Sequence, residues 1–414
     1  MTGVRVGRWA VAAGLAVGLV FGAAACGGGP DGARWGSDPA DPPAVPPQLA
    51  VTPEEGSTGT TLSTEIGTRT DGEITEVKLT TKEGDAVTGQ QRPDGSSWVP
   101  DQPLEPRTRY TAVVTATGAD GATASAQTSF TTMAAPSQRT GTGLYLFDGR
   151  SYGVAMPVVV EFVEPVPADA RAQVQRRMFV TTDPPQPGVW HWVEDGRQAF
   201  YRAPEHWQPG TTLQVRIGLD GHPTGDGRYG DADRSATATI GDRLELTVDN
   251  ASKSMSVREN GKLTKTFPVS LGKPSTPSSS GQMVVMSREE QTVFDTLDEL
   301  GPVEGYRIDI SYALRLTWGG EYIHSAPWSV GDQGVRNVSH GCVNLAPDDA
   351  QWLFKRIKVG DPVTVEGTER ELAQGNGWTA WDMSWEDFVA GSALPVPAEL
   401  QATVASPMPH AVPN

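Results

Sequence analysis

The sequence predicts a mainly β protein that is divided into several domains. Its 414 residues include 47 glycines and 33 prolines, a composition that favours turns and short strands over long helices. Short runs of alternating apolar and polar residues, separated by turn sequences such as Pro93-Asp94-Gly95, are typical of β-sandwiches. Apolar residues make up 37% of the chain, which is enough for real cores, and a chain of this length is expected to form about three domains.

The first two domains, at 48–134 and 135–240, are expected to be tandem β-sandwiches. The segment from Leu104 to Tyr110 resembles the corner of immunoglobulin-like modules, where a tyrosine hydroxyl bonds to upstream backbone. The second domain has no tyrosine at the matching place. The predicted strands are 74–80, 110–115, 126–131, 157–162, 189–193, 199–201 and 213–217, and a short helix is predicted at 169–177.

Several polar residues of the second domain have two interpretations. His191 and His206 lie beside tryptophans, so we expect them to pack inside the sandwich rather than bind a metal. An acidic, glycine-rich loop follows, and its carboxylates are of the kind that Ca²⁺ binds. These carboxylates are Asp220, Asp226, Asp231 and Asp233. Their spacing is not that of an EF-hand, and a solvated surface turn explains them equally well.

The N-terminal residues 1–26 have the pattern of a secretory signal. Two arginines precede an uncharged apolar run at 9–25, which is shorter than the usual membrane span of about 20 residues. The end of this segment resembles a bacterial lipobox, with Ala23 in place of the usual larger aliphatic residue. We therefore expect a lipid anchor at Cys26, a flexible linker at 27–47, and a location in the cell envelope, on the outer face of the cytoplasmic membrane.

The third domain is expected at 241–367 and is again rich in strands. The turn Asn260-Gly261 predicts a tight hairpin between two of these strands. Its predicted strands are 244–248, 254–258, 265–269, 282–286 and 363–365, with a loop at 278–281 and an amphipathic helix at 347–357.

A C-terminal extension at 368–393 carries several aromatic residues, which we expect to dock on a neighbouring domain. They are Trp378, Trp381, Trp385 and Phe388. Ser384 is expected to cap a short helix there. Residues 394–414 are rich in proline and alanine, and we expect them to be disordered.

The formal net charge of −17 excludes the basic face that nucleic-acid binding requires. An anionic polymer is a poor partner for the same reason. The negative charge is best explained as a solvated exterior.

The stretch from His324 to Asn344 carries the residues that indicate chemistry. It holds Cys342, one of two cysteines in the chain, together with His324 and His340. A thiol becomes a good nucleophile when a nearby imidazole takes its proton. Gly341 allows a sharp turn that presents backbone N–H groups to a carbonyl oxygen. If Cys26 carries lipid, the other cysteine is the only thiol of the mature chain, and an unpaired cysteine in a secreted protein is a candidate reactive thiol.

The segments 324–329 and 339–344 resemble the signature of the L,D-transpeptidases with a YkuD-type catalytic domain. The resemblance covers roughly the whole third domain and includes Tyr306 and the Gly319-Gly320 turn. It implies a YkuD-type β-rich fold behind two immunoglobulin-like sandwiches.

The same resemblance implies acyl transfer on peptidoglycan stem peptides, with no cofactor and no metal. Cys342 would attack a tetrapeptide donor, D-alanine would leave, and a thioester would remain. The diaminopimelate amine of a second stem would then resolve the thioester and form a 3→3 cross-link. Carbapenem β-lactams would form a thioester with the same cysteine.

The resemblance to the family also implies roles for individual residues of the site. His324 is the expected base and Ser325 orients its imidazole, while His340, the rival base, has a supporting role. The N–H groups of Gly341 and Cys342 would form the oxyanion hole. The expected substrate-binding residues are Tyr306, Gly319, Gly320, Trp328 and Asn344.

Two alternatives stay open at this point. With water as acceptor the protein would be an L,D-carboxypeptidase, and with a protein amine it would anchor proteins to peptidoglycan. A third hypothesis is a lipid-anchored, wall-binding spacer with an inactive catalytic domain. An ordinary cysteine pKa near 8.5 would indicate the spacer and a lowered pKa the enzyme.

Overall fold

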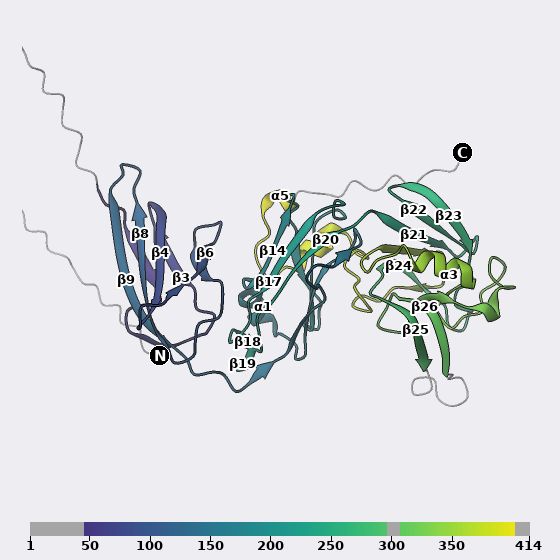
Figure 1. Ribbon diagram of the computed structural model, residues 1–414, viewed down its shortest axis with the longest axis horizontal. Helices are drawn as coiled ribbons and strands as arrows, with labels where there is room; N and C mark the ends of the chain where they lie inside the picture. The colour runs from purple at the N-terminus through teal and green to yellow at the C-terminus, as the bar shows by residue number, and fades with distance from the viewer. Residues whose placement is uncertain (1–44, 296–306, 402–414) are drawn as a thin grey trace, which may run out of the picture. The chain divides into compact units, whose positions relative to one another are not determined.

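The computed structural model describes residues 45–295 and 307–401 (Figure 1). Its first domain is a β-sandwich, as predicted, with one sheet in the order β1-β3-β7-β6 and the other in the order β2-β9-β8-β4-β5. Ile66, Leu79, Tyr110 and Phe130, each at most 2% exposed, fill its core. The strands are β1 (Leu49–Thr52), β2 (Ser57–Thr60), β3 (Ile66–Thr70), β4 (Glu73–Thr81), β5 (Ala86–Val87), β6 (Gly89–Gln91), β7 (Ser97–Pro100), β8 (Arg109–Thr117) and β9 (Thr123–Thr132).

Tyrosine corners occur in both sandwiches. In the first, the backbone N–H of Glu105 donates to the hydroxyl of Tyr110 over 2.9 Å, which confirms the predicted corner. In the second, the N–H of Phe147 donates to the hydroxyl of Tyr152 over 3.0 Å. The second corner was not predicted, because it precedes the long strands of its domain instead of following them. Each corner spans five residues and fixes the entry of the chain into a strand.

The second domain is also a two-sheet sandwich, with the orders β11-β13-β16-β15 and β12-β20-β17-β14 and a small third sheet, β10-β19-β18. Its elements are β10 (Arg139–Thr140), β11 (Thr142–Leu144), β12 (Ser151–Tyr152), β13 (Val158–Phe162), α1 (Ala168–Gln175), β14 (Met178–Asp183), β15 (Val189–Trp192), β16 (Gln198–Arg202), β17 (Thr212–Ile217), β18 (Pro223–Gly225), β19 (Arg228–Gly230) and β20 (Arg234–Ile240). The mainly β fold predicted from the turn-rich composition is therefore confirmed.

The third domain has two sheets, in the orders β23-β22-β21-β29-β24-β30 and β25-β26-β27-β28. Asn260 and Gly261 have φ values of 50° and 79°, as the tight hairpin turn between β22 and β23 requires. The elements are β21 (Leu244–Asp249), β22 (Ser254–Glu259), β23 (Lys262–Pro268), β24 (Ser279–Val284), β25 (Ser287–Asp295), β26 (Arg307–Arg315), β27 (Tyr322–Ser325), η1 (Pro327–Ser329), β28 (Val343–Leu345), α3 (Pro347–Phe354), β29 (Pro362–Glu366) and β30 (Arg370–Glu371).

The loop predicted at 278–281 is wrong, because β24 already begins at Ser279. Ser279 and Ser280 pair in parallel with Arg370 and Glu371 of β30. Serine and glycine residues predict a loop locally, but a partner 91 residues away supplies the ladder bonds of a strand.

The C-terminal extension docks on the second sandwich around Arg202, which is 2% exposed. Its guanidinium lies 4.4 Å from the ring centre of Trp381, 5.0 Å from that of Trp385 and 4.3 Å from that of Phe388. Its Nε donates to the carbonyl oxygen of Ala380 over 2.7 Å. Burial lowers the pKa of this guanidinium to about 9. The structure thus supports the predicted docking of the aromatic residues.

The two histidines of the second sandwich pack against the same extension. His191 stacks on Phe388 with ring centres 5.0 Å apart, and its Nδ1 bonds to the carbonyl oxygen of that residue over 2.9 Å. The rings of His206 and Trp381 form a T-shaped pair with their centres 4.5 Å apart. Packing rather than metal binding therefore explains both, although their partners lie outside the sandwich itself.

The disordered tail predicted from residue 394 is wrong for its first part. Ser384 caps α4 (Trp385–Ala390) by accepting the N–H of Asp387 over 3.0 Å, and a further helix, α5, spans Ala398–Gln401. Leu400 is buried and its carbonyl accepts the indole N–H of Trp385 over 2.7 Å. The proline- and alanine-rich composition of this segment gave no sign that Leu400 would be buried.

Several predictions fall on residues outside the described ranges. They are the signal and lipobox at 1–26, most of the linker at 27–47, Tyr306, and the end of the tail from 402. No helix within 45–295 or 307–401 combines the length and apolar character needed to cross a bilayer.

Replacing Arg202 by methionine is expected to loosen the C-terminal extension. The change removes the cation between three rings and leaves the Ala380 carbonyl without its donor, so unfolding free energy should fall by about 2–4 kcal/mol. Hydrogen exchange should rise at 378–390. Arg69→Met, on an exposed strand position, is the matched control and should stay within about 0.5 kcal/mol. Unchanged exchange at 378–390 in the Arg202 variant would contradict this account of docking.

Candidate active site

Two parallel strands bring the predicted nucleophile and base to one cavity. Strand β27 pairs with β28 so that Ile323 lies opposite Val343 and His324 opposite Asn344. Cys342 directly precedes β28. Because side chains two residues apart share a face of a strand, the histidine and the cysteine point to the same side.

The cavity has a volume of about 420 Å³. Five predicted site residues line it, namely His324, Trp328, His340, Cys342 and Asn344. Phe294, which by resemblance to the family is expected on the loop that covers the cleft, also lines it. The remaining lining residues, which the sequence analysis did not assign to the site, are Arg307, Ile308, Ile310, Val338 and Ser339.

His324 is 4% exposed and held in one tautomer. Its Nδ1 lies 2.8 Å from the carbonyl oxygen of Ser325. Since a carbonyl can only accept, Nδ1 carries the hydrogen and Nε2 carries the lone pair. The rings of Phe294 and Trp328 lie 5.4 and 5.9 Å from the imidazole. Burial lowers the pKa of His324 to about 4, so the imidazole is a neutral base at neutral pH.

Cys342 is 7% exposed and is a thiol in the resting site. Its Sγ donates to the carbonyl oxygen of Gly320 over 3.7 Å. Burial raises the pKa of the thiol to about 12, the Tyr322 N–H opposes this rise, and the Glu321 carboxylate adds to it. The lowered pKa expected for an enzymatic cysteine is therefore not found. A neutral thiol and a neutral imidazole line one cavity, so the proton can pass at the moment of attack.

The turn before β28 differs from the prediction in one respect. Gly341 has φ 131°, a region that favours glycine, as the sharp turn required. Its N–H, however, donates to the hydroxyl of Ser339 over 3.1 Å, and this hydroxyl in turn donates to the carbonyl oxygen of Cys342 over 2.6 Å. The Gly341 N–H predicted for the oxyanion hole is thus occupied within the turn itself. Spacing alone cannot reveal this competition from a neighbouring hydroxyl.

His340 has a partner of its own. Its Nε2 lies 3.0 Å from the ammonium of Lys273. Because the ammonium can only donate, Nε2 of His340 must accept. This geometry favours His324 over His340 as the base.

Of the other predicted substrate-binding residues, Trp328 and Asn344 line the cavity, whereas Gly319 and Gly320 are not among its lining residues. The N–H of Gly319 donates to the side-chain oxygen of Asn376 over 2.8 Å, which ties the glycine turn to the C-terminal extension. Asn344 donates from Nδ2 to the hydroxyl of Ser329 over 3.0 Å. Trp328 is 54% exposed and forms an open wall. The roles of these residues toward a substrate stay predictions.

The carboxylates of the loop at 220–233 do not form a cation site. Each carboxylate pairs with an arginine: Asp220 with Arg139 at 2.9 Å, Asp226 with Arg228 at 3.9 Å, Asp231 with Arg234 at 2.9 Å and Asp233 with Arg216 at 3.2 Å. Across the described part of the chain no group of three or more metal-ligating side chains could hold an ion. Arg139 and Arg216 lie outside the loop in the sequence. Arg228 and Arg234 lie within the loop or directly after it, but nothing in the sequence distinguishes them from ordinary surface charges.

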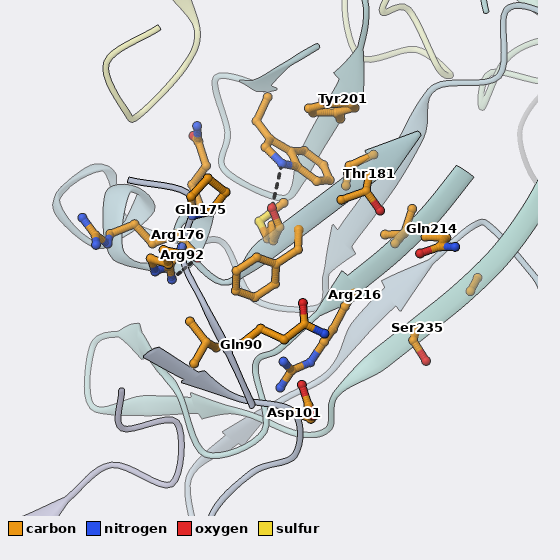
Figure 2. Close-up of a pocket in the computed structure, with 18 of the residues that line it drawn as sticks. Gln90, Arg92, Asp101, Gln175, Arg176, Thr181, Tyr201, Gln214, Arg216 and Ser235 are labelled. Carbon is orange, nitrogen blue, oxygen red and sulfur yellow. Dashed lines mark hydrogen bonds between the residues drawn. The ribbon is translucent and has the colours of Figure 1, made fainter. Parts of the chain in front are cut away.

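A larger hollow, of about 760 Å³, is lined by none of the predicted catalytic or substrate-binding residues. Figure 2 shows its wall, with Tyr201, Thr181 and Arg216 around it. Trp190 and Met178 also line it, and the indole N–H of Trp190 donates to the carbonyl oxygen of Met178 over 3.1 Å. No cysteine or histidine lines this hollow, so it offers no nucleophile–base pair.

Comparisons with known proteins show the family to which the chain belongs. Residues 57–223 match the model of a bacterial Ig domain, and residues 244–365 match that of the L,D-transpeptidase catalytic domain. The chain is 35% identical over 398 residues to L,D-transpeptidase 2 of Mycobacterium tuberculosis, a match that covers 94% of this chain and 96% of the relative. The chain belongs to the L,D-transpeptidase family. It is accordingly an enzyme of the acyltransferase class.

Other members of the family match parts of the chain. L,D-transpeptidase 1 of Mycobacterium tuberculosis is 40% identical over 227 residues, which cover 53% of this chain and 82% of the relative. Among solved structures, an L,D-transpeptidase in complex with imipenem is 35% identical and has a TM-score of 0.46, covering 56% of this chain and 100% of its own. An L,D-transpeptidase from Mycobacterium smegmatis is 31% identical with a TM-score of 0.44, covering 55% of this chain and 99% of its own.

The raised thiol pKa predicts an unusual pH dependence for modification of the L,D-transpeptidase cysteine. Without substrate, the thiolate fraction of Cys342 should rise about tenfold per pH unit from pH 7 to 10, with no plateau near pH 8.5. Alkylation of Cys342 by iodoacetamide, followed by mass spectrometry of the peptide that contains it, measures this directly. The same protein unfolded in urea is the control; its alkylation rate should reach half of its maximum near pH 8.5 and level off above that pH. A plateau below pH 8 in the folded protein would contradict the assignment of a resting thiol.

Proposed function

We propose that this member of the L,D-transpeptidase family forms 3→3 peptidoglycan cross-links through a thioester on Cys342. The observation that carries the proposal is that Cys342 and His324 line one cavity, where the hydrogen bond to Ser325 leaves Nε2 of His324 as a proton acceptor. The N-terminal Ig-like sandwiches and the near-complete match to a full-length relative support the same function.

In the first half of the proposed reaction, the Cys342 sulfur attacks the carbonyl of the third residue of a tetrapeptide donor. The thiol proton passes to Nε2 of His324 as the carbon–sulfur bond forms. The tetrahedral intermediate then expels the D-alanine amine, which takes the proton from the imidazole. A thioester remains, and His324 is neutral again.

In the second half, the diaminopimelate amine of another stem attacks the thioester. His324 takes a proton from that amine, and the returning thiol takes it back as the carbon–sulfur bond breaks. The backbone N–H of Cys342 is the donor that we assign to the oxyanion. The N–H of Gly341 could join it only by leaving the Ser339 hydroxyl.

The shape of the cavity is compatible with such a donor. Phe294 and the half-exposed Trp328 form apolar walls beside the imidazole. Arg307 also lines the cavity, and its guanidinium is paired with the carboxylate of Asp295 at 3.2 Å.

The Cys342→Ala variant is expected to lose D-alanine release completely, while its unfolding temperature stays within a few degrees of the parent. Incubation of the full chain with a disaccharide-tetrapeptide, followed by intact-protein mass spectrometry, should show an acyl-enzyme only in the parent. A carbapenem should likewise add mass only when the cysteine is present. The His324→Gln variant should keep the thiol but form the acyl-enzyme at least about a hundredfold more slowly. Normal turnover by the alanine variant would overturn the proposal.

The acceptor is decided by product analysis of the same incubation. Dimers with a 3→3 linkage support the transpeptidase. Tripeptide alone would indicate an L,D-carboxypeptidase, and a peptide joined to a protein amine would indicate an anchoring enzyme. No acyl-enzyme and no product would favour the inactive wall-binding spacer.

We also propose that Cys26 carries lipid and anchors the protein to the outer face of the cytoplasmic membrane, on the strength of the lipobox-like sequence at 23–26. The Cys26→Ser variant should move from the membrane fraction to the soluble fraction of the cell envelope. Cys342→Ser, which leaves the lipobox intact, is the control and should stay with the membrane. An unchanged distribution of the Cys26 variant would contradict the lipid anchor.

A further inference from the structure

We propose that Arg370, a residue beyond the matched catalytic domain, is a positioning residue that neutralises Glu321 beside the nucleophile and so keeps Cys342 reactive. This inference rests on the proposed role of Cys342 as nucleophile. It gives the start of the C-terminal extension a part in the chemistry.

Glu321 is a buried acid at the edge of the active site. It directly precedes β27 and is 6% exposed. Its Oε1 accepts the backbone N–H of Ser279 over 2.9 Å and a guanidinium N–H of Arg370. Its Oε2 is buried and has no hydrogen-bond partner. A carboxylate in such surroundings depends on its one cationic partner to offset the cost of burial.

This carboxylate borders the catalytic turn. A Cβ atom placed on Gly341 would lie 3.7 Å from Oε1 of Glu321 and 4.0 Å from a guanidinium nitrogen of Arg370. The next residue along from Glu321 is Tyr322, whose backbone N–H lowers the pKa of the Cys342 thiol. The negative charge of Glu321 opposes a second negative charge on that sulfur and raises the same pKa. The ion pair between Glu321 and Arg370 therefore determines how strongly the Glu321 charge disfavours the thiolate form of Cys342.

Arg370 is held in place by the strand pairing that the sequence did not predict. Strand β30 adds to β24 with Arg370 opposite Ser279, and the Nε of Arg370 donates to the hydroxyl of Ser279 over 3.1 Å. The backbone N–H of Leu372 continues the pairing by donating to the carbonyl oxygen of Ser280 over 2.8 Å. The side chain of Arg370 is 47% exposed, whereas the side chain of Glu321 is 8% exposed. The guanidinium therefore extends from the surface to a buried carboxylate.

Removing each charge in turn separates an electrostatic role from a structural one. Arg370→Met leaves the carboxylate uncompensated and should make the Cys342 thiolate harder to form. Glu321→Gln keeps an oxygen for the Ser279 N–H and removes the negative charge, so it should make the thiolate easier to form. Combining the two substitutions removes both charges and should bring the reactivity back to that of the parent.

The experiment is alkylation of Cys342 by iodoacetamide in the full chain at pH 9, followed by mass spectrometry of the peptide that contains Cys342. Arg370→Met should react roughly three- to tenfold more slowly than the parent, as expected for two charges near a protein surface. Glu321→Gln should react faster than the parent, and the double variant should return to within about twofold of it. Arg356→Met is the matched control, because Arg356 is 42% exposed and pairs with Glu259 at 3.7 Å elsewhere in the same domain; its rate should not change.

Two results would overturn the proposal. The first is an unchanged alkylation rate in Arg370→Met. The second is a slower rate that the added Glu321→Gln substitution does not restore, which would show that Arg370 acts only by holding the fold. Because the reagent contains no peptide, the outcome is independent of whether the enzyme forms cross-links, so failure of the proposed function and failure of this inference are distinguishable.

Discussion

The structure of the active site depends on the parallel pairing of β27 with β28. This pairing sets His324 level with Asn344 and places Cys342 one residue before the strand, on the same side as the histidine. A shift of one residue would turn the histidine to the other face of the sheet and away from the sulfur. The cavity, the walls of Phe294 and Trp328, and the turn at Gly341 are all arranged around this register.

Burial determines the protonation state of this pair. It lowers the pKa of His324 to about 4 and raises that of Cys342 to about 12, so both groups are neutral in the resting site. In the proposed reaction, the nucleophile forms only when a substrate carbonyl is present to accept the sulfur. Glu321 and Arg370 adjust this balance from outside the cavity, and Asn376 fixes the glycine turn from the same C-terminal region.

The sequence allowed the three β-rich domains, the hairpin at Asn260-Gly261 and the catalytic segment to be predicted, because alternation, turn residues and motif spacing are local signals. It did not reveal features that depend on residues far apart in the chain. Strand β24 begins at Ser279 because β30 lies beside it, and Asp220 of the acidic loop pairs with Arg139 rather than with a cation. The Gly341 N–H was assigned to an oxyanion hole from its place in a turn, yet the Ser339 hydroxyl accepts it. A buried tail residue, Leu400, gave no periodic signal at all.

Nuclear magnetic resonance of the protein labelled with ¹⁵N at histidine tests the central claim most directly, because it reports the charge and tautomer of the imidazole in the resting enzyme. The account predicts that His324 at pH 7 is neutral, with hydrogen on Nδ1 and a lone pair on Nε2, and that it stays neutral when Cys342 is replaced by alanine. A His324 ring that carries two protons at pH 7 in the parent, and loses one of them in the alanine variant, would show a resting thiolate–imidazolium pair and contradict the account.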